Sequence, residues 1–377
     1  MKVTAVDLFC GSGGLSYGLQ EAGISVVKGV DKDPDCKYAY EANVDAEFRQ
    51  MDVKSLAQNP EPIERWYPWD TDVRVLAACA PCQPYSTMGH QKDRGHEDHE
   101  KWGMLKYVKQ IVEQVKPDVV VTENVMQVRN DDVYDEFVAS LEEMGYDINS
   151  DENKNVYGPD YGIPQKRKRW VLLASNLGEE SEEYEELRLP EPEELDEDYD
   201  TNVKDHIGHL PPVEAGEPHP EYDAHRARNL SDINLERIDN MEPGGDWRLW
   251  EEKGREDLLA DCHRKDSGRS YKAPYSRMVG DEPAPTITTQ FYNYGSGRFG
   301  HYDTGQNRAL TLLEGAILQT FPEDYEFYDE WEDVGVTNLG RMIGNAVPPL
   351  LGEHIGEAIL SHVGADTEEV APAAADD

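Results

Sequence analysis

Short apolar runs, separated by amphipathic stretches and glycine turns, divide the first 175 residues. Apolar runs at 3–9, 25–30, 73–78, 119–122 and 171–174 have the length of buried strands, and 47–53 is a further short candidate. Between them, apolar residues recur at helical spacing in 15–21, 102–115 and 131–144, the last of which is followed by Gly145. Strands that alternate with helices predict an α/β fold with a mainly parallel sheet.

The pattern changes from about residue 176. Residues 179–200 form the densest acidic run, with two prolines, and predict a solvated linker or insertion. Residues 202–282 are rich in turn formers, which predicts a smaller irregular domain, and 284–289 reads as an extended strand. Helices are predicted at 308–320, with Thr311 as its cap, and at 350–362, and we expect a disordered tail. We therefore divide the chain into residues 1–175, 176–305, 306–362 and 363–377.

A glycine turn follows the first predicted strand. The sequence Cys10-Gly11-Ser12-Gly13-Gly14 leads into a helix, and the second strand ends at Asp31. Glycine lets the backbone approach a ligand closely, and an acid at this offset accepts hydrogen bonds from ribose hydroxyls. This layout predicts a nucleoside-binding βαβ unit and fits both a nicotinamide cofactor and S-adenosylmethionine. Asp52 is either a partner for an adenine amino group or a solvated loop carboxylate.

A cysteine lies just past the strand predicted at 73–78. Pro81 and Pro84 make the turn around Cys82 rigid. Ligands of open α/β sheets bind outside the carboxyl ends of the strands, so a thiol there is placed for nucleophilic attack. The alternatives are a small buried hydrophobic residue, or a redox or metal pair with Cys79, for which the chain offers no second close pair.

Two further charged features belong to this end of the predicted sheet. Glu123 directly follows the strand at 119–122 and would face the same crevice, unless it is a solvated loop carboxylate. Residues 166–169 are four consecutive basic residues; strand alternation would place Arg167 and Arg169 on one face, where guanidinium groups suit phosphates and base edges. A solvated charge run is the alternative. Residues 91–101, near three histidines without a standard metal spacing, predict a mobile loop over the site.

The charge balance changes the expected setting. The chain carries 77 acidic and 36 basic residues, for a formal net charge of −41. Alone, this argues against a nucleic-acid partner. At molar salt the Debye length is about 3 Å, so a halophilic cytoplasm would screen the self-repulsion, and local basic clusters would then decide the partner. Five cysteines without a disulfide framework, and no apolar stretch of membrane-spanning length, predict a soluble cytoplasmic protein.

Taken together and in order, the motifs resemble those of the DNA (cytosine-5) methyltransferases. Residues 7–14 resemble the cofactor loop, Pro81-Cys82-Gln83 the nucleophile motif and Glu123-Asn124-Val125 the second catalytic motif. Gln165-x-Arg167-x-Arg169, residues 308–311 and residues 344–347 complete the set. Ala80, Tyr85 and Lys32 depart mildly from the family pattern. With the acidity, the resemblance indicates a member from a halophilic archaeon.

The resemblance implies a Rossmann-like S-adenosylmethionine-dependent catalytic domain at 1–175. Residues 176–305 would hold the acidic insertion and a smaller irregular target-recognition domain, and 306–362 would return to the catalytic domain. The Cys82 thiolate would add to carbon 6 of a flipped-out cytosine in duplex DNA, and Glu123 would hold or protonate the ring nitrogen. Arg169 would contact the exocyclic oxygen, Arg167 would help hold the site and phosphates, and carbon 5 would take the methyl group. The implied contacts with S-adenosylmethionine, without a metal, are Phe9, Gly11, Ser12, Gly13, Gly14, Asp31, Asp52, Pro81 and Asn345.

The implied partner is double-stranded DNA, with the enzyme acting as a monomer and away from membranes. A cognate restriction endonuclease is a further partner that the resemblance allows. We expect a DNA cleft lined by Arg167, Arg169, Arg298 and Lys166, with the acidic residues on outer faces. The alternatives are a tRNA cytosine-5 methyltransferase and a catalytically silent nucleic-acid-binding relative. A nicotinamide dehydrogenase is the weakest alternative, because that class of enzyme does not need a set of cysteine, glutamate and arginine residues.

Overall fold

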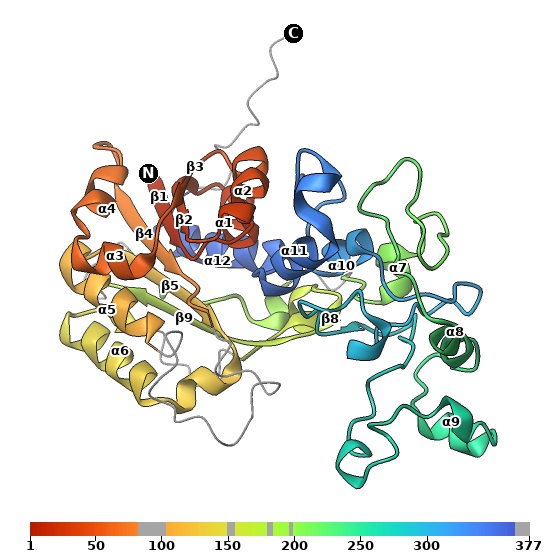
Figure 1. Cartoon of the computed structure of the whole chain (residues 1–377). Coiled ribbons are helices and arrows are strands. Elements are labelled where there is room, and N and C mark those ends of the chain that lie inside the picture. The colour runs from red at the N-terminus through yellow and green to blue at the C-terminus, as the bar shows by residue number, and fades with distance from the viewer. Residues whose placement is uncertain (82–102, 149–154, 179–183, 196–198, 366–377) are drawn as a thin grey trace. The chain divides into compact units, whose positions relative to one another are not determined.

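The computed structural model describes residues 1–81, 103–148, 155–178, 184–195 and 199–365 (Figure 1). By their contacts, these residues form two compact units. The first unit contains Met1–Tyr157, Lys168–Asp196 and Val347–Asp377, and the second contains Gly158–Arg167 and Glu197–Ala346. The division that we drew from the sequence concerns the function of each part, and contacts within the structure do not test it. By their contacts, residues 306–346 belong to the second unit.

A mixed sheet forms the centre of the first unit. The five neighbouring strands from β3 to β5 are parallel, and β9 runs antiparallel to β5. Strands β1 and β5 are buried at every position, as expected for strands covered on both faces. The predicted α/β fold with a mainly parallel sheet is confirmed. In sheet order, the described strands are β3 (Glu47–Gln50), β2 (Ser25–Asp31), β1 (Val3–Leu8), β4 (Val73–Ala78), β5 (Val119–Asn124), β9 (Lys168–Ser175) and β6 (Asp147–Ile148), with β7 (Asn155–Tyr157) also pairing with β9.

Helices cover both faces of this sheet (Figure 1). Helices α3 (Val53–Gln58), α5 (Met104–Val115) and α6 (Asp132–Glu143) share one apolar core with the strands. Helices α1 (Gly14–Glu21) and α12 (Pro349–His362) contact each other closely, so the C-terminal helix belongs to the first unit. Two short helices, α2 (Lys37–Asn43) and α4 (Glu61–Trp66), complete the set among the described residues.

The second unit consists mainly of turns and short helices. Its strands β8 (Gln165–Lys166) and β10 (Ala284–Pro285) pair in parallel, so the strand predicted at 284–289 is much shorter than expected. The helix predicted at 308–320 is α10 (Leu312–Leu318), and Thr311 caps it as predicted, by accepting from the Glu314 N–H. The other helices described here are α7 (Val203–Ile207), α8 (Asp232–Asp239), α9 (Arg248–Glu252) and α11 (Trp331–Asn345).

Short 3-10 turns connect these elements. They are η1 (Pro34–Cys36), η4 (Met126–Asn130), η5 (Gly158–Tyr161), η6 (Pro192–Glu194), η7 (Glu256–Leu258), η8 (Asp266–Gly268) and η9 (Tyr294–Ser296).

Candidate active site

The glycine turn between β1 and α1 has the backbone geometry of a ligand-binding loop. Phe9, Gly11 and Gly13 all have positive φ angles, of 62°, 52° and 96°. Glycine adopts this conformation without steric cost, whereas Phe9 is held there by the surrounding loop. Gly14 begins α1, so the turn places backbone N–H groups at a helix start beside the carboxyl end of β1.

Asp31 fixes this turn to the end of the neighbouring strand. Its Oδ2 accepts a hydrogen bond from the Gly11 N–H at 3.1 Å, and its Oδ1 accepts one from the Asp33 N–H at 2.9 Å. Burial raises the pKa of Asp31, and these backbone hydrogen bonds partly oppose the rise. The structure therefore brings Asp31 and the glycine turn together, as the spacing predicted.

Asp7 is a buried carboxylate of the same site that our sequence reasoning left out of the cofactor contacts. Its Oδ2 accepts from the Ser16 hydroxyl at 2.7 Å, and Ser16 also contacts the Tyr40 hydroxyl at 3.0 Å. Among the described residues, Oδ1 has no hydrogen-bond partner, although Asp7 is only 1% exposed. Burial raises the pKa of Asp7 from 3.8 to about 7. One acid inside an apolar strand was the signal that could have revealed it.

Two other predicted cofactor residues have ordinary structural surroundings. The Asp52 side chain caps α3 by accepting from the Lys54 N–H at 2.9 Å, and it is exposed. Ser12 is buried within the turn. The backbone next to Asp52 still lies beside the end of β2. The N–H of the preceding residue, Met51, donates to the Asp31 carbonyl at 2.9 Å.

Glu123 and Arg169 form a partly shielded ion pair at the end of the sheet. Strand β5 ends at Asn124, so Glu123 is its penultimate residue rather than the residue after the strand. Its neighbour β9 brings Arg169 alongside, with Nε 2.7 Å from Glu123 Oε1. Only 10% of the Glu123 side chain and 14% of the Arg169 side chain are exposed. The guanidinium group therefore holds the carboxylate in a fixed position.

The same strand also holds the segment that leads to the predicted nucleophile. The Asn124 side-chain amide donates to the Ala80 carbonyl at 3.1 Å, and both residues are buried. Strands β4 and β5 are parallel neighbours, so their carboxyl ends lie at one edge of the sheet, as predicted. Pro81 is half-buried there. Cys82, the predicted nucleophile, and the predicted loop at 91–101 lie outside the described residues.

Arg167 and Arg169 do not share the continuous strand that the alternation predicted. The strand is interrupted between β8 and β9 at Arg167, and the two arginines fall in different compact units. Arg167 is 4% exposed and donates to the carbonyls of Ile287 and Ala346, at 3.3 and 3.1 Å. These contacts indicate a positioning role within the second unit.

A buried glutamine two residues before Arg167 also forms hydrogen bonds to distant segments. Gln165 donates to the Leu318 carbonyl at 2.9 Å and accepts from the Ile287 N–H at 3.1 Å. Gln165 and Arg167 therefore tie β8 to two distant segments of the second unit. Nearby, a Cβ on Gly344 would lie 2.4 Å from the Thr288 backbone, which explains a glycine at that position. Asn345 is exposed at the end of α11, and its contact with a cofactor remains a prediction.

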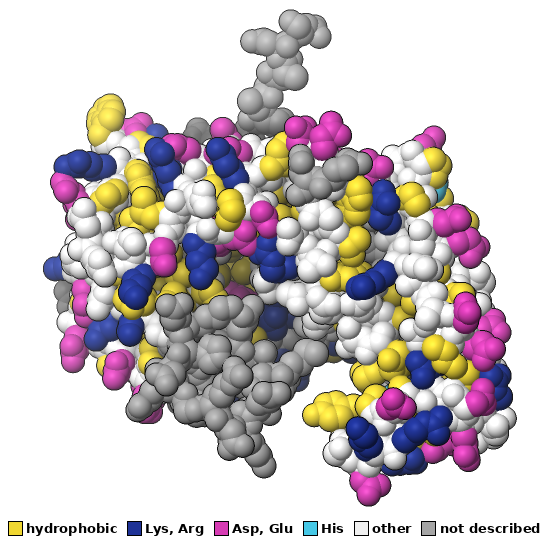
Figure 2. Space-filling view, in the orientation of Figure 1, with side chains coloured by type: hydrophobic (Ala, Val, Ile, Leu, Met, Phe, Trp, Pro, Cys, Tyr) yellow, Lys and Arg dark blue, Asp and Glu magenta, His cyan; other side chains and the backbone are white. Residues whose placement is uncertain are grey.

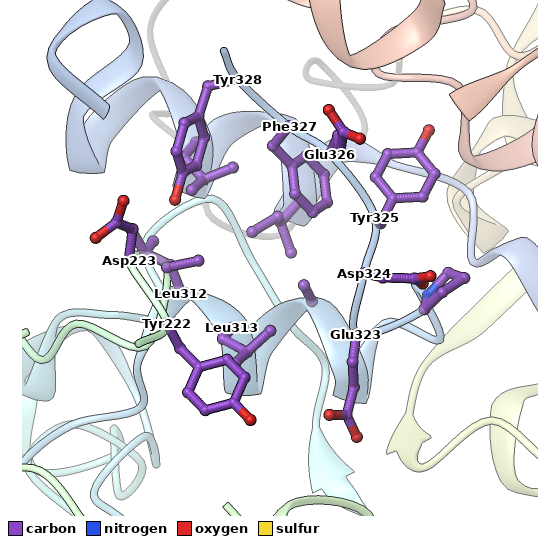
Figure 3. A pocket seen from close by; sticks show the side chains of 15 residues that line it. Tyr222, Asp223, Leu312, Leu313, Glu323, Asp324, Tyr325, Glu326, Phe327 and Tyr328 are labelled. Carbon is purple, nitrogen blue, oxygen red and sulfur yellow. The ribbon is translucent and has the colours of Figure 1, made fainter. Parts of the chain in front are cut away.

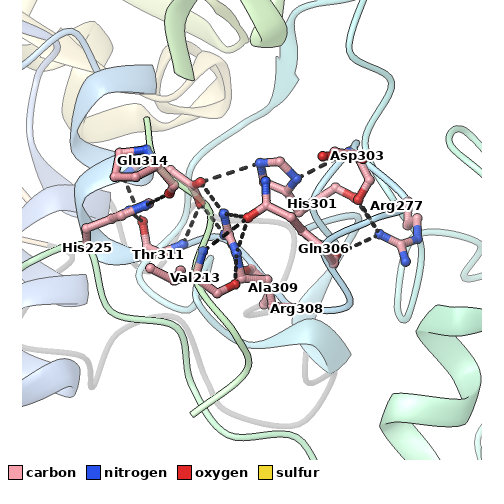
Figure 4. A network of polar contacts seen from close by, with 11 residues as sticks. Val213, His225, Arg277, His301, Asp303, Gln306, Arg308, Ala309, Thr311 and Glu314 are labelled. Carbon is pink, nitrogen blue, oxygen red and sulfur yellow. Dashed lines mark hydrogen bonds and ion pairs between the residues drawn. The ribbon is translucent and has the colours of Figure 1, made fainter. Parts of the chain in front are cut away.

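A buried polar network stabilises the centre of the second unit (Figure 4). Arg308 and Glu314 are each 1% exposed and form two hydrogen bonds of 2.7 Å. His301 approaches Glu314 at 3.4 Å. Burial alone would raise the pKa of Glu314, but Arg308 and His301 lower it well below its usual range. The network fixes the start of α10, and its buried ion pair is a structural feature.

A separate pocket of about 230 Å³ lies within the second unit. Figure 3 shows Asp223, Glu323, Asp324 and Glu326 around it, together with aromatic side chains. None of the predicted site residues lines it. Its carboxylates would repel DNA phosphates, so we assign this pocket no part in substrate binding.

Charges of both signs are mixed on the molecular surface. On the face drawn in Figure 2, acidic and basic side chains are interspersed over the surface of the described residues. The part of the chain that the structure describes holds no group of three or more acidic, histidine or cysteine side chains suited to a metal ion. Among these residues, no helix is long and apolar enough to cross a membrane.

The glycine turn, the two acids beside it and the Glu123–Arg169 pair define a Rossmann-like enzyme that uses a nucleoside cofactor. The chain belongs to the family of C-5 cytosine-specific DNA methylases, whose family model matches residues 3–361. It is therefore a DNA (cytosine-5) methyltransferase, and S-adenosylmethionine is its methyl donor.

Curated relatives match nearly the whole chain. The chain is 40% identical to "Type II methylase M.HgiDII" of Herpetosiphon aurantiacus over 363 residues, which cover 95% of both proteins. It is 31% identical to "Type II methyltransferase M1.HphI" of Haemophilus parahaemolyticus, with 96% of this chain and 87% of the relative covered. Both relatives are bacterial, so they give no support to the archaeal origin inferred from the acidity.

Solved structures confirm the fold. A candidate DNA modification methyltransferase from an Escherichia coli prophage has a TM-score of 0.68 at 19% identity, with 96% of this chain and 100% of that chain covered. The S. pombe Dnmt2 methyltransferase has a TM-score of 0.58 at 18% identity, with 96% and 98% covered. These similarities support the predicted Rossmann-like methyltransferase fold.

Proposed function

We propose that this enzyme methylates cytosine in duplex DNA through a covalent adduct of Cys82. The observation that carries the proposal is the buried Glu123–Arg169 pair, beside the segment that Asn124 holds at Ala80. This arrangement places a carboxylate and a guanidinium group at the same sheet edge as the chain leading to Cys82. A base inside a duplex is out of reach of that edge, so the target cytosine is flipped out of the stack.

The proposed chemistry makes carbon 5 a nucleophile. The Cys82 thiolate adds to carbon 6, and Glu123 in its protonated form gives its proton to ring nitrogen 3, so no negative charge builds up on the ring. Arg169 donates to the exocyclic oxygen and orients Glu123. Bound S-adenosylmethionine would supply an electrophilic methyl group to carbon 5, with the sulfonium–methyl bond breaking and S-adenosylhomocysteine leaving. Loss of the carbon 5 proton to a base then expels the Cys82 thiolate, and the nitrogen 3 proton returns to Glu123.

The first unit carries suitable groups for the cofactor. Asp7 Oδ1 is a buried carboxylate oxygen without a partner among the described residues, and a cationic ammonium group would supply one. We assign it to the methionine ammonium of S-adenosylmethionine, with Gly11 to Gly14 around that end of the cofactor. Phe9 would contact the adenine, and Asp31 would accept from the ribose hydroxyls. Ser12, Asp52 and Pro81, which belong to the same unit, keep their proposed places around this ligand.

We also infer the setting in which the enzyme works. Two relatives carry the name of type II methylases, which supports a role as the modification partner of a restriction endonuclease. Action on DNA and the absence of a disulfide framework favour a cytoplasmic location, and we infer a monomer from the family resemblance. The net charge of −41 favours a halophilic cytoplasm.

Methyl transfer from labelled S-adenosylmethionine to genomic DNA and to tRNA tests the proposal. The assay uses wild type, Cys82→Ser, Glu123→Gln and the control Cys262→Ser, whose cysteine is exposed in the second unit. We expect 5-methylcytosine in DNA with wild type and the control, none with Cys82→Ser, and a loss of about 100-fold or more with Glu123→Gln. Label in tRNA alone would show that tRNA, and not DNA, is the substrate. Full activity of Cys82→Ser would refute the covalent mechanism.

A further inference from the structure

The lysines of the second unit fall into two groups. Lys166, Lys204 and Lys253 each form an ion pair with a carboxylate. Lys265 and Lys272 are exposed, and neither has an ion-pair or hydrogen-bond partner for its ammonium group among the described residues. Lys272 is near enough to Asp246 to help lower the pKa of that carboxyl, but it forms no ion pair with it. In a chain with a net charge of −41, two exposed lysines without an ion-pair partner among the described residues form a local exception.

Both lysines lie in residues 264–274, which we call the basic segment. It contains four basic residues and one acidic residue. Arg264 is also exposed; its guanidinium donates to the Glu256 carbonyl at 2.8 Å, and its charge helps to lower the pKa of the exposed Asp257 carboxyl. Tyr271, beside Lys272, is 68% exposed. The basic segment therefore presents cationic groups and one large aromatic side chain to solvent.

A rigid aromatic base supports the basic segment. The His263 ring is fully buried, stacks on Trp247 with ring centres 5.5 Å apart, and meets the edge of Tyr275. The Arg269 guanidinium lies over the Trp247 ring, 4.5 Å from its centre, and forms hydrogen bonds of 3.1 and 3.0 Å with Glu251. Both ends of the exposed stretch are thereby fixed to the unit.

A tight turn sets the shape of the basic segment. The Gly268 N–H donates to the Lys265 carbonyl at 2.9 Å. A Cβ at Gly268 would lie 1.9 Å from the Cys262 carbonyl oxygen, which is closer than real Cβ contacts come. The chain can make this turn only with glycine, so the positions of the neighbouring cationic side chains depend on it.

We propose that the basic segment binds the DNA substrate, with Lys265 and Lys272 on phosphates and Tyr271 against the DNA between them. The inference rests on the proposed function, because it names the contact surface for that duplex. Lysine ammonium groups bind phosphates as point charges, and tyrosine hydroxyls donate to the same backbone. The other lysines of the unit are neutralised, so these two are the ones able to release counterions from DNA.

Duplex binding as a function of potassium chloride concentration tests this surface. The variants are Lys265→Gln/Lys272→Gln and Tyr271→Ala, and the matched control is Lys253→Gln, an exposed lysine paired with Glu242 at 2.8 Å. Each lost phosphate contact reduces the slope of log K against log salt by about 0.9, so the double variant should lose nearly two. We expect the KM for DNA to rise in both test variants while kcat at saturating DNA stays unchanged.

The opposite result is equally clear. A double variant with the salt slope and KM of Lys253→Gln would overturn the proposal, as would an unchanged KM in Tyr271→Ala. Wild type must first methylate DNA, so failure of the proposed function would appear as absent transfer by wild type rather than as an equal slope. Gly268→Ala is expected to weaken DNA binding without removing a charge, and should it fail to fold, the lysine variants still decide, because their side chains are exposed.

Discussion

Asp7 shows how a single residue links folding to cofactor binding. Its carboxyl group is buried beside the cofactor turn, with one oxygen bound to Ser16 and the other without a partner among the described residues. Burial disfavours the charged form, so the pKa rises to about 7. The unliganded protein thus carries an unfavourable group that a cationic ligand would stabilise.

Asp7→Asn should stabilise the unliganded enzyme at high pH and weaken cofactor binding. Because the folded pKa is raised, wild-type stability due to this group falls as pH increases from about 4 to 7 and is then constant. The shift of about three units corresponds to at most about 4 kcal/mol. We expect the variant to gain a higher Tm than wild type at pH 8 but not at pH 4, and to bind S-adenosylmethionine more weakly by calorimetry.

Asp70→Asn is the control for that experiment. Asp70 is exposed, and its hydrogen bond from Lys2 lowers its pKa, so it is ionised throughout the range from pH 5 to 8. Its effect on Tm should therefore be the same at pH 5 and at pH 8. A constant difference between Asp7→Asn and wild type from pH 4 to 8 would contradict the role assigned to Asp7.

At the residue scale, sequence reasoning succeeded where a motif followed a strand. The turn at Gly11 and its partner Asp31 were predictable because backbone geometry requires glycine there and an acid at a set offset. The burial of Arg167 was not predictable, because its partners Ile287 and Ala346 lie more than 100 residues away. Period-two alternation also could not reveal that the strand is interrupted at this residue.

Gly18→Ala tests the contact between the first and last helices of the first unit. An added Cβ would lie 2.1 Å from the Pro349 carbonyl oxygen and 2.6 Å from the Glu353 nitrogen, both of which are backbone atoms of α12. Backbone cannot move aside cheaply, so we expect a loss of about 3 kcal/mol or more and a Tm lower by at least about 5 °C. Thermal unfolding followed by circular dichroism measures it.

Gly103→Ala is the matched control, because the three described atoms nearest to an added Cβ there all belong to the flexible Lys106 side chain. It should change Tm by no more than about 1 °C. Equal Tm values for the two variants would show that α12 moves away from α1 without cost, against the close packing seen in the structure.

Glu314→Gln tests the buried ion pair at the start of α10. The substitution leaves the Arg308 charge buried without its carboxylate, so we expect a loss of about 3–5 kcal/mol at pH 7. The folded pKa of Glu314 is lowered, so its contribution is complete above the unfolded pKa of about 4.5 and declines as pH falls below it. The stability difference between wild type and variant should therefore shrink on acidification, as urea unfolding from pH 7 to pH 3 would reveal.

Thr311→Ala serves as a milder comparison. It removes the cap and the contact of the Thr311 hydroxyl with His225 Nδ1 at 3.0 Å, and it should cost about 1–2 kcal/mol without the pH dependence of a lost carboxyl group. A pH-independent loss in Glu314→Gln would contradict the lowered pKa of the carboxyl group. The cap itself was predictable from the sequence, because Thr311 and Glu314 have capping-box spacing. The short β10 was not, because pairing with β8 depends on a tertiary contact.

For the whole molecule, local patterns predicted the order of strands and helices but not the grouping of distant segments. Helix α12 joins the first unit through small residues on α1, whereas residues 306–346 belong to the second unit. An apolar helix can pack on either unit, so periodicity alone leaves this choice open. Net charge likewise did not exclude the partner, since a member of the DNA methylase family with a charge of −41 acts on a polyanion.

This acidity leads to a prediction about salt. At 0.1 M salt the Debye length is about 10 Å, so neighbouring carboxylates repel one another, and at 1 M it is about 3 Å. We expect the Tm to rise steadily when potassium chloride is increased from 0.1 to 2 M. Sucrose at matched osmolality is the control, because it stabilises by exclusion from the surface without screening charge. An equal rise in sucrose, or a constant Tm in potassium chloride, would show that repulsion among the 77 acidic residues does not limit stability, and the inferred halophilic setting would lose its physical basis.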